Sequence, residues 1–245
     1  GAAFLAAWGV ALRVYDRDPF YQRDDVRGAA ERVEAESAPG DAVVVDYDDH
    51  AFRHYFDGPA RLGILDATRD EHAVAAELAA LAAPGGTVFL IEWKQGRTDH
   101  RGMLPALLEA NGRYEGWDRH YGLRVHRYVL APDAALAVPT LRSERAGFGV
   151  VRLVGAWADD RVSAADGLPV ALRWSLPRAT DRRLKSVVAL LDPAGNRVAQ
   201  ADTLIQDGRG LTTERWAPGA ESTMYAVVPV PVGTVPGTYR LEVGV

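Results

Sequence analysis

The stretch Ala42-Val43-Val44-Val45-Asp46 is apolar and mostly β-branched until it ends at a carboxylate. A short run of this kind is typical of a strand that is covered on both faces in a parallel sheet, because no position in it turns towards water. The turn residues Pro39-Gly40-Asp41 stand directly before it and end a helical pattern. We therefore expect residues 42–46 to form the first strand of an α/β sheet.

Helical and strand-like patterns alternate around this strand. Apolar residues at helical spacing predict helices over residues 21–37, through residue 55, over 70–81 and over 103–111. Apolar runs predict strands at residues 62–65 and 87–91, and alternating patterns at 114–117 and 123–130 predict an antiparallel hairpin. Strands that alternate with helices imply right-handed crossovers, so residues 21–135 are predicted to be a three-layer, Rossmann-like α/β domain with a mostly parallel sheet.

The pattern changes across residues 136–146, which we expect to be a linker. Residues 147–245 contain only strand-like runs, separated by turn sequences such as Asp192-Pro193-Ala194-Gly195-Asn196 and Pro236-Gly237. Six or seven short strands at this spacing predict an all-β sandwich of immunoglobulin-like type. Its large aromatic residues could either stack on sugar rings or fill the core of the sandwich. They are Trp157, Trp174, Trp216, Tyr225 and Tyr239.

Composition narrows the range of functions. The chain has 245 residues and a formal net charge of -5, with 33 acidic and 28 basic residues. A nucleic-acid-binding protein usually carries a basic stripe, so we expect no nucleic-acid partner. The chain has no cysteine, which excludes disulfides, thiolate metal sites and a cysteine nucleophile.

Residues 1–20 are expected to be the end of a membrane helix or a linker. The apolar run from Phe4 to Tyr15 has about a dozen residues, whereas a membrane-spanning helix needs roughly 20. One reading is a buried segment that packs on the first domain. The other is the outer end of a membrane helix, with Trp8 and Tyr15 suited to the membrane interface.

Two acidic segments leave the carboxyl ends of predicted strands, where α/β sheets usually bind ligands. The candidate ligand-binding residues are Asp46, Asp48, Asp49, His50, Glu92 and Trp93. Carboxylates with an imidazole could hold a divalent cation or perform acid-base chemistry, which is the chemistry of a metal-assisted hydrolase. Alternatively, Asp48 or Asp49 caps the following helix and the other side chains are solvated. We therefore assign neither a metal site nor a catalytic residue.

Other sequence signals are weaker. No phosphate-binding glycine motif follows the first strand, so no nucleotide cofactor is expected. Neither Gly-x-Ser-x-Gly nor His-Glu-x-x-His occurs in the chain. Arg97 and Arg101 flank Asp99 and could meet an anionic head group, but an exposed charged loop is the expected structure. His120 and His126 are expected to be surface or hydrogen-bonded histidines.

Several stretches resemble the region that follows the last membrane helix in bacterial membrane glycosyltransferases of the GT-C class. These enzymes include the protein O-mannosyltransferases and the lipid A aminoarabinose transferase. In the first half the similar stretches are residues 21–30, 39–43 and 52–56. In the family pattern an aromatic-rich segment leads into an Arg-Gly helix, a Pro-Gly-Asp turn and the first strand of a soluble α/β domain. In the second half they resemble the sandwich appended to some of these enzymes, and they are residues 152–155, 190–195, 200–202, 212–219 and 236–241.

The resemblance implies an extracytoplasmic location on a bacterial cell membrane. In this family the catalytic acid and the lipid-phosphate sugar donor belong to the membrane portion, so no catalytic residue is transferred to this chain and the chain alone is expected to be inactive. The implied partners are the membrane portion of the same polypeptide and a glycan or lipid-linked acceptor. A secreted carbohydrate-binding or adhesion module is the alternative function, with the metal-assisted hydrolase as a second alternative.

Overall fold

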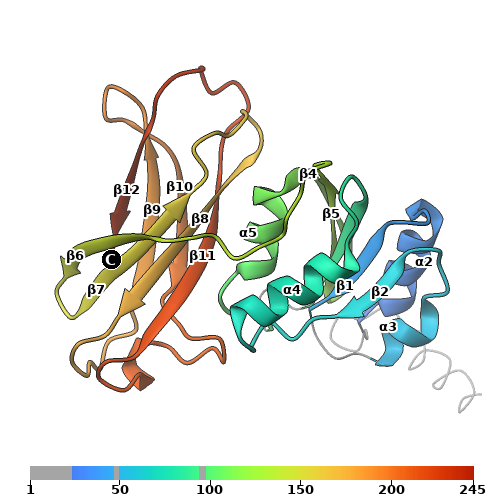
Figure 1. Cartoon of the computed structure of the whole chain (residues 1–245), viewed down its shortest axis with the longest axis horizontal. Coiled ribbons are helices and arrows are strands. Elements are labelled where there is room, and N and C mark those ends of the chain that lie inside the picture. Colours follow the sequence, from blue (N-terminus) through green and yellow to red (C-terminus); the bar gives the residue numbers. More distant parts are fainter. Residues whose placement is uncertain (1–23, 47–49, 94–97) are drawn as a thin grey trace, which may run out of the picture.

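The structure is a computed structural model that describes residues 24–46, 50–93 and 98–245. Figure 1 shows two parts side by side, a sheet flanked by helices and an all-β part. Strands make up 40% of the described residues and helices 18%. The first part ends at β5, and β6 opens the second part.

The first part is built on a five-stranded sheet with the strand order β2-β1-β3-β5-β4. Its strands are β1 (Ala42–Val45), β2 (Arg61–Ile64), β3 (Thr87–Trp93), β4 (Gly112–His120) and β5 (Leu123–Leu130). β1 pairs in parallel with both β2 and β3, while β5 pairs antiparallel with both β3 and β4. All four residues of β1 are buried, as expected for a strand covered on both faces.

Within residues 24–46, 50–93 and 98–245, four helices cover the two faces of this sheet. They are α2 (Val26–Glu36), α3 (His50–Tyr55), α4 (Glu71–Leu81) and α5 (Met103–Ala110). α2 and α3 pack with Val43 and Val45 on one face, whereas α4 and α5 pack with Val44 on the other. The alternation of β1 side chains between the two clusters follows from the two-residue period of a strand.

The prediction of a three-layer α/β domain with a mostly parallel sheet is wrong. The sheet is mixed, and the described chain as a whole is mostly β. The cause lies in the hairpin after α5. Only Tyr121 and Gly122 separate β4 from β5, and so short a turn can join only antiparallel strands. β5 also pairs with β3, so it lies between β3 and β4 and runs against the direction of both.

The second part is a β-sandwich, as the sequence predicted. One sheet has the order β11-β8-β7-β6 and the other β10-β9-β12, and all pairings are antiparallel. The strands are β6 (Arg142–Phe148), β7 (Val151–Ala158), β8 (Gly167–Ser175), β9 (Lys185–Leu191), β10 (Arg197–Leu204), β11 (Glu221–Pro229) and β12 (Arg240–Gly244). Trp174, Leu190 and Met224 meet in a core that draws on both sheets.

The two parts share one core and a polar network. Ala171 of β8 and Tyr225 of β11 belong to the same buried cluster as α4 and α5. The backbone N–H of Tyr225 donates to the Arg101 carbonyl at 2.8 Å. Gly102, with φ of 71°, lets this loop approach, because a Cβ there would lie 2.9 Å from the Tyr225 carbonyl oxygen.

Glu71, the first residue of α4, is the centre of the polar network. Its carboxylate accepts from the Tyr225 hydroxyl at 3.0 Å and from Arg173 at 3.5 Å, and Arg101 lies 3.8 Å away. Two of these partners come from the sandwich and one from the loop before α5. A largely buried carboxylate paired in this way resists separation of the two parts, since an opened interface would leave charges without their partners.

Candidate functional site

A pocket of about 450 Å³ lies where the carboxyl ends of β1 and β3 meet the sandwich. Both parts of the molecule line it. The first part contributes Asp46, Glu92, Asp99 and His100, and the sandwich contributes Gln206 and Tyr225 among others. We call this the seam pocket. Its position agrees with the general preference of such sheets for ligands beyond the carboxyl ends of their strands.

Asp46 forms the floor of the seam pocket. It follows β1 directly and only 3% of its surface is exposed. Burial, together with the neighbouring carboxyl groups of Asp99 and Glu92, raises the pKa of its carboxyl group to about 7. The backbone N–H of Trp93 donates to Asp46 Oδ1 at 3.4 Å. Near neutral pH this group can therefore either donate or accept a proton.

Asp99 is the second buried carboxyl group of the pocket. One of its oxygens accepts from the backbone N–H of Leu104 at 2.7 Å, in the first turn of α5. Its other oxygen, Oδ1, is buried and has no hydrogen-bond partner among the described residues. Burial also raises the pKa of Asp99. A buried polar atom without a partner lowers the stability of the folded chain.

Glu92 connects the pocket to a hydrogen-bonded histidine. Glu92 Oε2 lies 3.2 Å from Nε2 of His126, whose Nδ1 lies 3.1 Å from the Tyr114 hydroxyl. With the proton on Nε2, the imidazole donates to Glu92 and accepts from Tyr114. Burial raises the pKa of Tyr114 to about 12, so this hydroxyl stays a donor at neutral pH. The chain of three side chains fixes the Glu92 carboxylate at the mouth of the pocket.

Asp99 and Arg101, in the described part of the loop before α5, are buried, which corrects the expectation of an exposed charged loop, whereas Arg97 lies outside the described residues. Arg101 is only 8% exposed, and its guanidinium donates to the carbonyls of Ala67 and Arg69 at 2.9 and 2.8 Å. The Gln206 side-chain amide donates to the His100 carbonyl across the seam. The Arg101 Nε is buried and has no hydrogen-bond partner among the described residues, and Arg101 lines the seam pocket together with the three carboxyl groups.

The predicted site residues are only partly brought together. Asp46 and Glu92 both line the seam pocket. His50 is exposed at the start of α3, and Trp93 packs on the opposite face of the sheet, where its indole N–H donates to Asp24. Asp48 and Asp49 lie outside the described residues. The sequence indicated Tyr225 only as a sugar-stacking or core aromatic residue and Asp99 only as part of a charged loop, and it did not single out Gln206.

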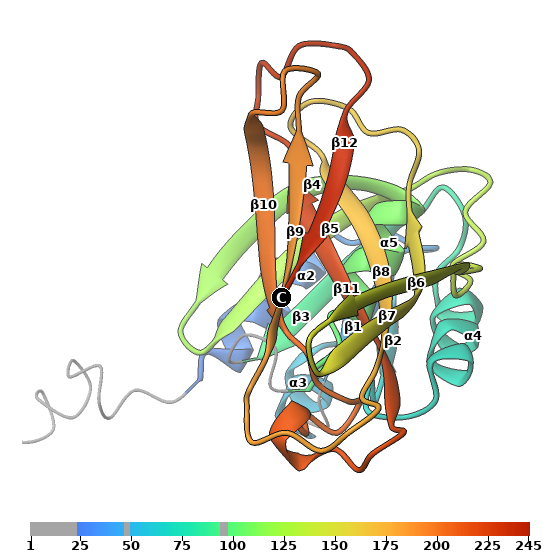
Figure 2. The same cartoon turned by 90° about the vertical axis from the view of Figure 1, so that its left-hand side faces the viewer.

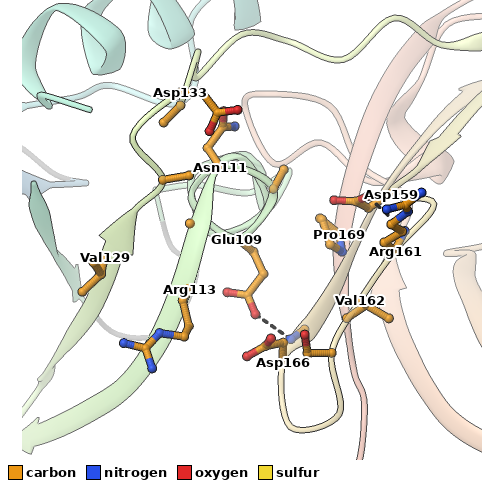
Figure 3. Close-up of a pocket in the computed structure, with 16 residues that line it drawn as sticks. Glu109, Asn111, Arg113, Val129, Asp133, Asp159, Arg161, Val162, Asp166 and Pro169 are labelled. Carbon is orange, nitrogen blue, oxygen red and sulfur yellow. Dashed lines mark hydrogen bonds between the residues drawn. The ribbon is translucent and has the colours of Figure 1, made fainter. Parts of the chain in front are cut away.

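A second pocket, of about 570 Å³, lies at the C-terminal end of α5. Figure 3 shows Glu109 of α5 pointing across it towards the turn before β8. Glu109 Oε1 accepts from the backbone N–H of Gly167 at 2.7 Å. Burial, together with the nearby Asp166, raises the pKa of Glu109 to about 7. This contact joins the two parts and is a structural element rather than a binding group.

The described residues bear on the other sequence-based hypotheses as well. Trp174, Trp216 and Tyr225 are buried, so they fill cores rather than stack on a sugar at the surface. Within residues 24–46, 50–93 and 98–245, no group of three His, Cys, Asp or Glu side chains is arranged to hold a metal ion. No helix of the same residues has the length and apolar character needed to cross a membrane.

Comparison of the chain with family models, curated proteins and solved structures gave no match.

Proposed function

We propose that this chain is the extracytoplasmic portion of a bacterial membrane glycosyltransferase and that it holds the acceptor rather than carrying out the transfer. In the intact enzyme, a sugar would pass from a polyprenyl-phosphate donor to an acceptor that rests in the seam pocket. The catalytic acid would belong to the membrane portion. The partner of this chain is therefore the rest of its own polypeptide.

The observation that carries the proposal is the position of the seam pocket between the two parts. A ligand there contacts the ends of β1 and β3 and also the sandwich, through Gln206 and Tyr225. The sandwich therefore supplies one side of the pocket, and the sheet supplies the other side. This arrangement supports an acceptor-positioning role, because such a role requires a shaped recess but no complete catalytic group.

The chemistry of the pocket suits a polyhydroxylated ligand. Asp46, Glu92 and Asp99 line the pocket, and carboxyl oxygens accept hydrogen bonds from hydroxyl groups. Binding sites usually combine an apolar lining with a few fixed polar groups, and Leu90, Leu104 and Met224 supply the apolar part here. The sequence resemblance to GT-C enzymes adds the expectation that the ligand is a glycan or a lipid-linked glycan.

The test is calorimetric titration of the full chain with a panel of soluble mono- and disaccharides. We expect at least one saccharide to bind, and we expect Glu92→Gln and Asp46→Asn to weaken it about tenfold or more, since a hydrogen bond to a charged group contributes about 1.5 to 3 kcal/mol. Asp57→Asn, which changes an exposed carboxylate away from the pocket, is the matched control. Absence of binding across the panel, or equal affinity in all variants, would remove the acceptor role.

A further inference from the structure

One face of the five-stranded sheet carries a row of charged side chains that begins in the seam pocket. The residues before and after Glu92 pack on the α2 side of the sheet, so Glu92 points to the opposite face. Asp46 follows the last paired residue of β1 and lies at the level of Glu92. Glu92 pairs with Arg124 of β5, which pairs with Arg119 of β4. Because neighbouring strands lie about 4.8 Å apart, the row from Asp46 to Arg119 is about 14 Å long.

Two pockets meet along this row. The seam pocket, of about 450 Å³, includes Asp46 and Glu92. A neighbouring pocket of about 400 Å³ includes Glu92 again, together with Trp117, Arg119 and Arg124. We call the two pockets together the sheet groove, because the Glu92 side chain lines both. In Figure 2 the end of the β4–β5 hairpin extends beyond the side of the sandwich, so the sandwich does not cover the far end of the groove.

The far end of the sheet groove carries an aromatic ring that its neighbours hold in place. Trp117 is 47% exposed. The Arg124 guanidinium stacks over its ring at 4.6 Å from the centroid, and the centroid of the His126 ring lies 6.3 Å away. Arg124 is also ion-paired with Glu92 at 3.8 Å, and His126 Nε2 lies 3.2 Å from the same carboxylate. These four side chains form one connected set, so the ring is positioned before a ligand binds.

The charges of the sheet groove favour a neutral ligand that is rich in hydroxyl groups. Asp46 and Glu92 line one end, and Arg119 and Arg124 line the other. An anion would meet carboxyl groups at one end, and a cation would meet guanidinium groups at the other. A hydroxyl group can donate to a carboxylate and accept from a guanidinium, so a chain of sugar rings suits both ends. The C–H groups on the face of a sugar ring also pack well on Trp117, because the face of an aromatic ring is electron-rich.

We propose that the sheet groove binds an oligosaccharide, with one sugar unit in the seam pocket and another stacked on Trp117. The row of charged side chains is longer than a single sugar ring, so the ligand class is an oligosaccharide rather than a monosaccharide. Trp117 is then a specificity-determining residue, because it favours longer chains without contacting the first sugar. This inference rests on the proposed function, since it extends the acceptor site beyond the seam pocket.

The test is calorimetric titration of the full chain with gluco- and manno-oligosaccharides, from the monosaccharide to the tetrasaccharide. We expect the wild type to bind the longer saccharides more tightly than the monosaccharide. Trp117→Ala should weaken binding of the longer saccharides about tenfold, the upper range for one aromatic contact, and leave the monosaccharide unchanged. Trp117→Phe keeps an aromatic ring and should recover most of the loss. The matched control is Val232→Ala, which changes an exposed apolar side chain of the sandwich.

A second variant tests the same end of the groove without removing the ring. Arg119→Ala should weaken binding of the longer saccharides about fivefold, as expected for one hydrogen bond to a charged group, and leave the monosaccharide unchanged. Near-ultraviolet circular dichroism shows whether each variant is folded, because Trp117 packs beside His126. If Trp117→Ala does not fold, Arg119→Ala and Trp117→Phe decide the result, and wild-type affinity of Arg119→Ala for every saccharide would overturn the inference.

The outcomes separate this inference from the proposed function. Asp46→Asn may weaken binding while Trp117→Ala and Arg119→Ala bind the longer saccharides as tightly as the wild type. The sheet groove would then be wrong, and the acceptor role of the seam pocket would stand. If Trp117→Ala weakens even the monosaccharide and Asp46→Asn has no effect, the sugar binds at Trp117 alone, and both proposals are wrong. Absence of binding by every saccharide would also overturn both.

Discussion

Replacing Asp46 with asparagine should make the protein more stable at neutral and alkaline pH. The buried carboxyl group has a pKa raised to about 7 from an ordinary value of 3.8. Below about pH 4 the group is protonated in both the folded and the unfolded chain, so it has no effect on stability there. Between about pH 4 and pH 7 the Asp46 carboxyl group is ionised only in the unfolded chain. The folded state therefore loses stability steadily as the pH rises through this range.

The size of the effect follows from the same numbers. Raising the pKa from 3.8 to about 7 costs the folded state about 4 kcal/mol above pH 7, at about 1.4 kcal/mol per pH unit. Asparagine keeps an oxygen that can accept from the Trp93 N–H, so the substitution removes the charge and little else. For a chain of this length, 4 kcal/mol corresponds to an increase in melting temperature of roughly 10 °C.

The assay is thermal unfolding of the wild type and Asp46→Asn at pH 4 and pH 8, with Asp57→Asn as the control at an exposed position. We expect the two melting temperatures to coincide at pH 4 and to differ by roughly 10 °C at pH 8, with the variant higher. A variant that is equally or less stable at pH 8 would refute the reasoning about Asp46. If Asp46→Asn is more stable but binds saccharide poorly, the Asp46 carboxyl group serves ligand binding at the expense of stability.

Two further substitutions test the contacts between the two parts. Glu109→Gln keeps the acceptor for the Gly167 N–H but removes a carboxyl group whose pKa is raised to about 7. The unfolding free energy of this variant, measured in urea, should equal that of the wild type at pH 4 and exceed it by about 1 kcal/mol at pH 8. This figure is smaller than the pKa shift alone would give, because Glu109 is partly exposed to water. A larger difference at pH 4 than at pH 8 would contradict the prediction. Tyr225→Phe removes the hydroxyl that donates to Glu71. We expect it to lower the unfolding free energy by about 2 kcal/mol at pH 7, and an unchanged urea midpoint would show that Arg173 and Arg101 satisfy Glu71 without it.

Local patterns in the sequence were sufficient for most individual elements. The run at residues 42–46 predicted β1, and the alternation at residues 123–130 predicted β5. The mixed sheet was not predicted, because strand order depends on contacts between residues far apart in the chain. The hairpin pattern at β4 and β5 was visible, but nothing local indicated that β5 returns between β3 and β4.

In the candidate site, too, local sequence patterns predicted some residues and missed those that depend on contacts between distant parts of the chain. Asp46 and Glu92 could be found because each stands at the end of an apolar run, and a general rule places ligands at strand ends. Asp99 and Arg101 were expected to be exposed because their segment is highly charged. They are buried because the sandwich covers that loop, through Tyr225 and Gln206. Contacts between two parts of a chain leave no periodic signal in either part.

The assignment to a membrane glycosyltransferase can be examined without the protein itself, by sequencing the source DNA immediately before the Gly1 codon. We expect an open reading frame that encodes roughly ten or more apolar spans of about 20 residues each, joined directly to this chain. A start codon or a secretory signal peptide a short distance upstream would contradict the assignment, and the chain would then have to be studied as a separate binding protein.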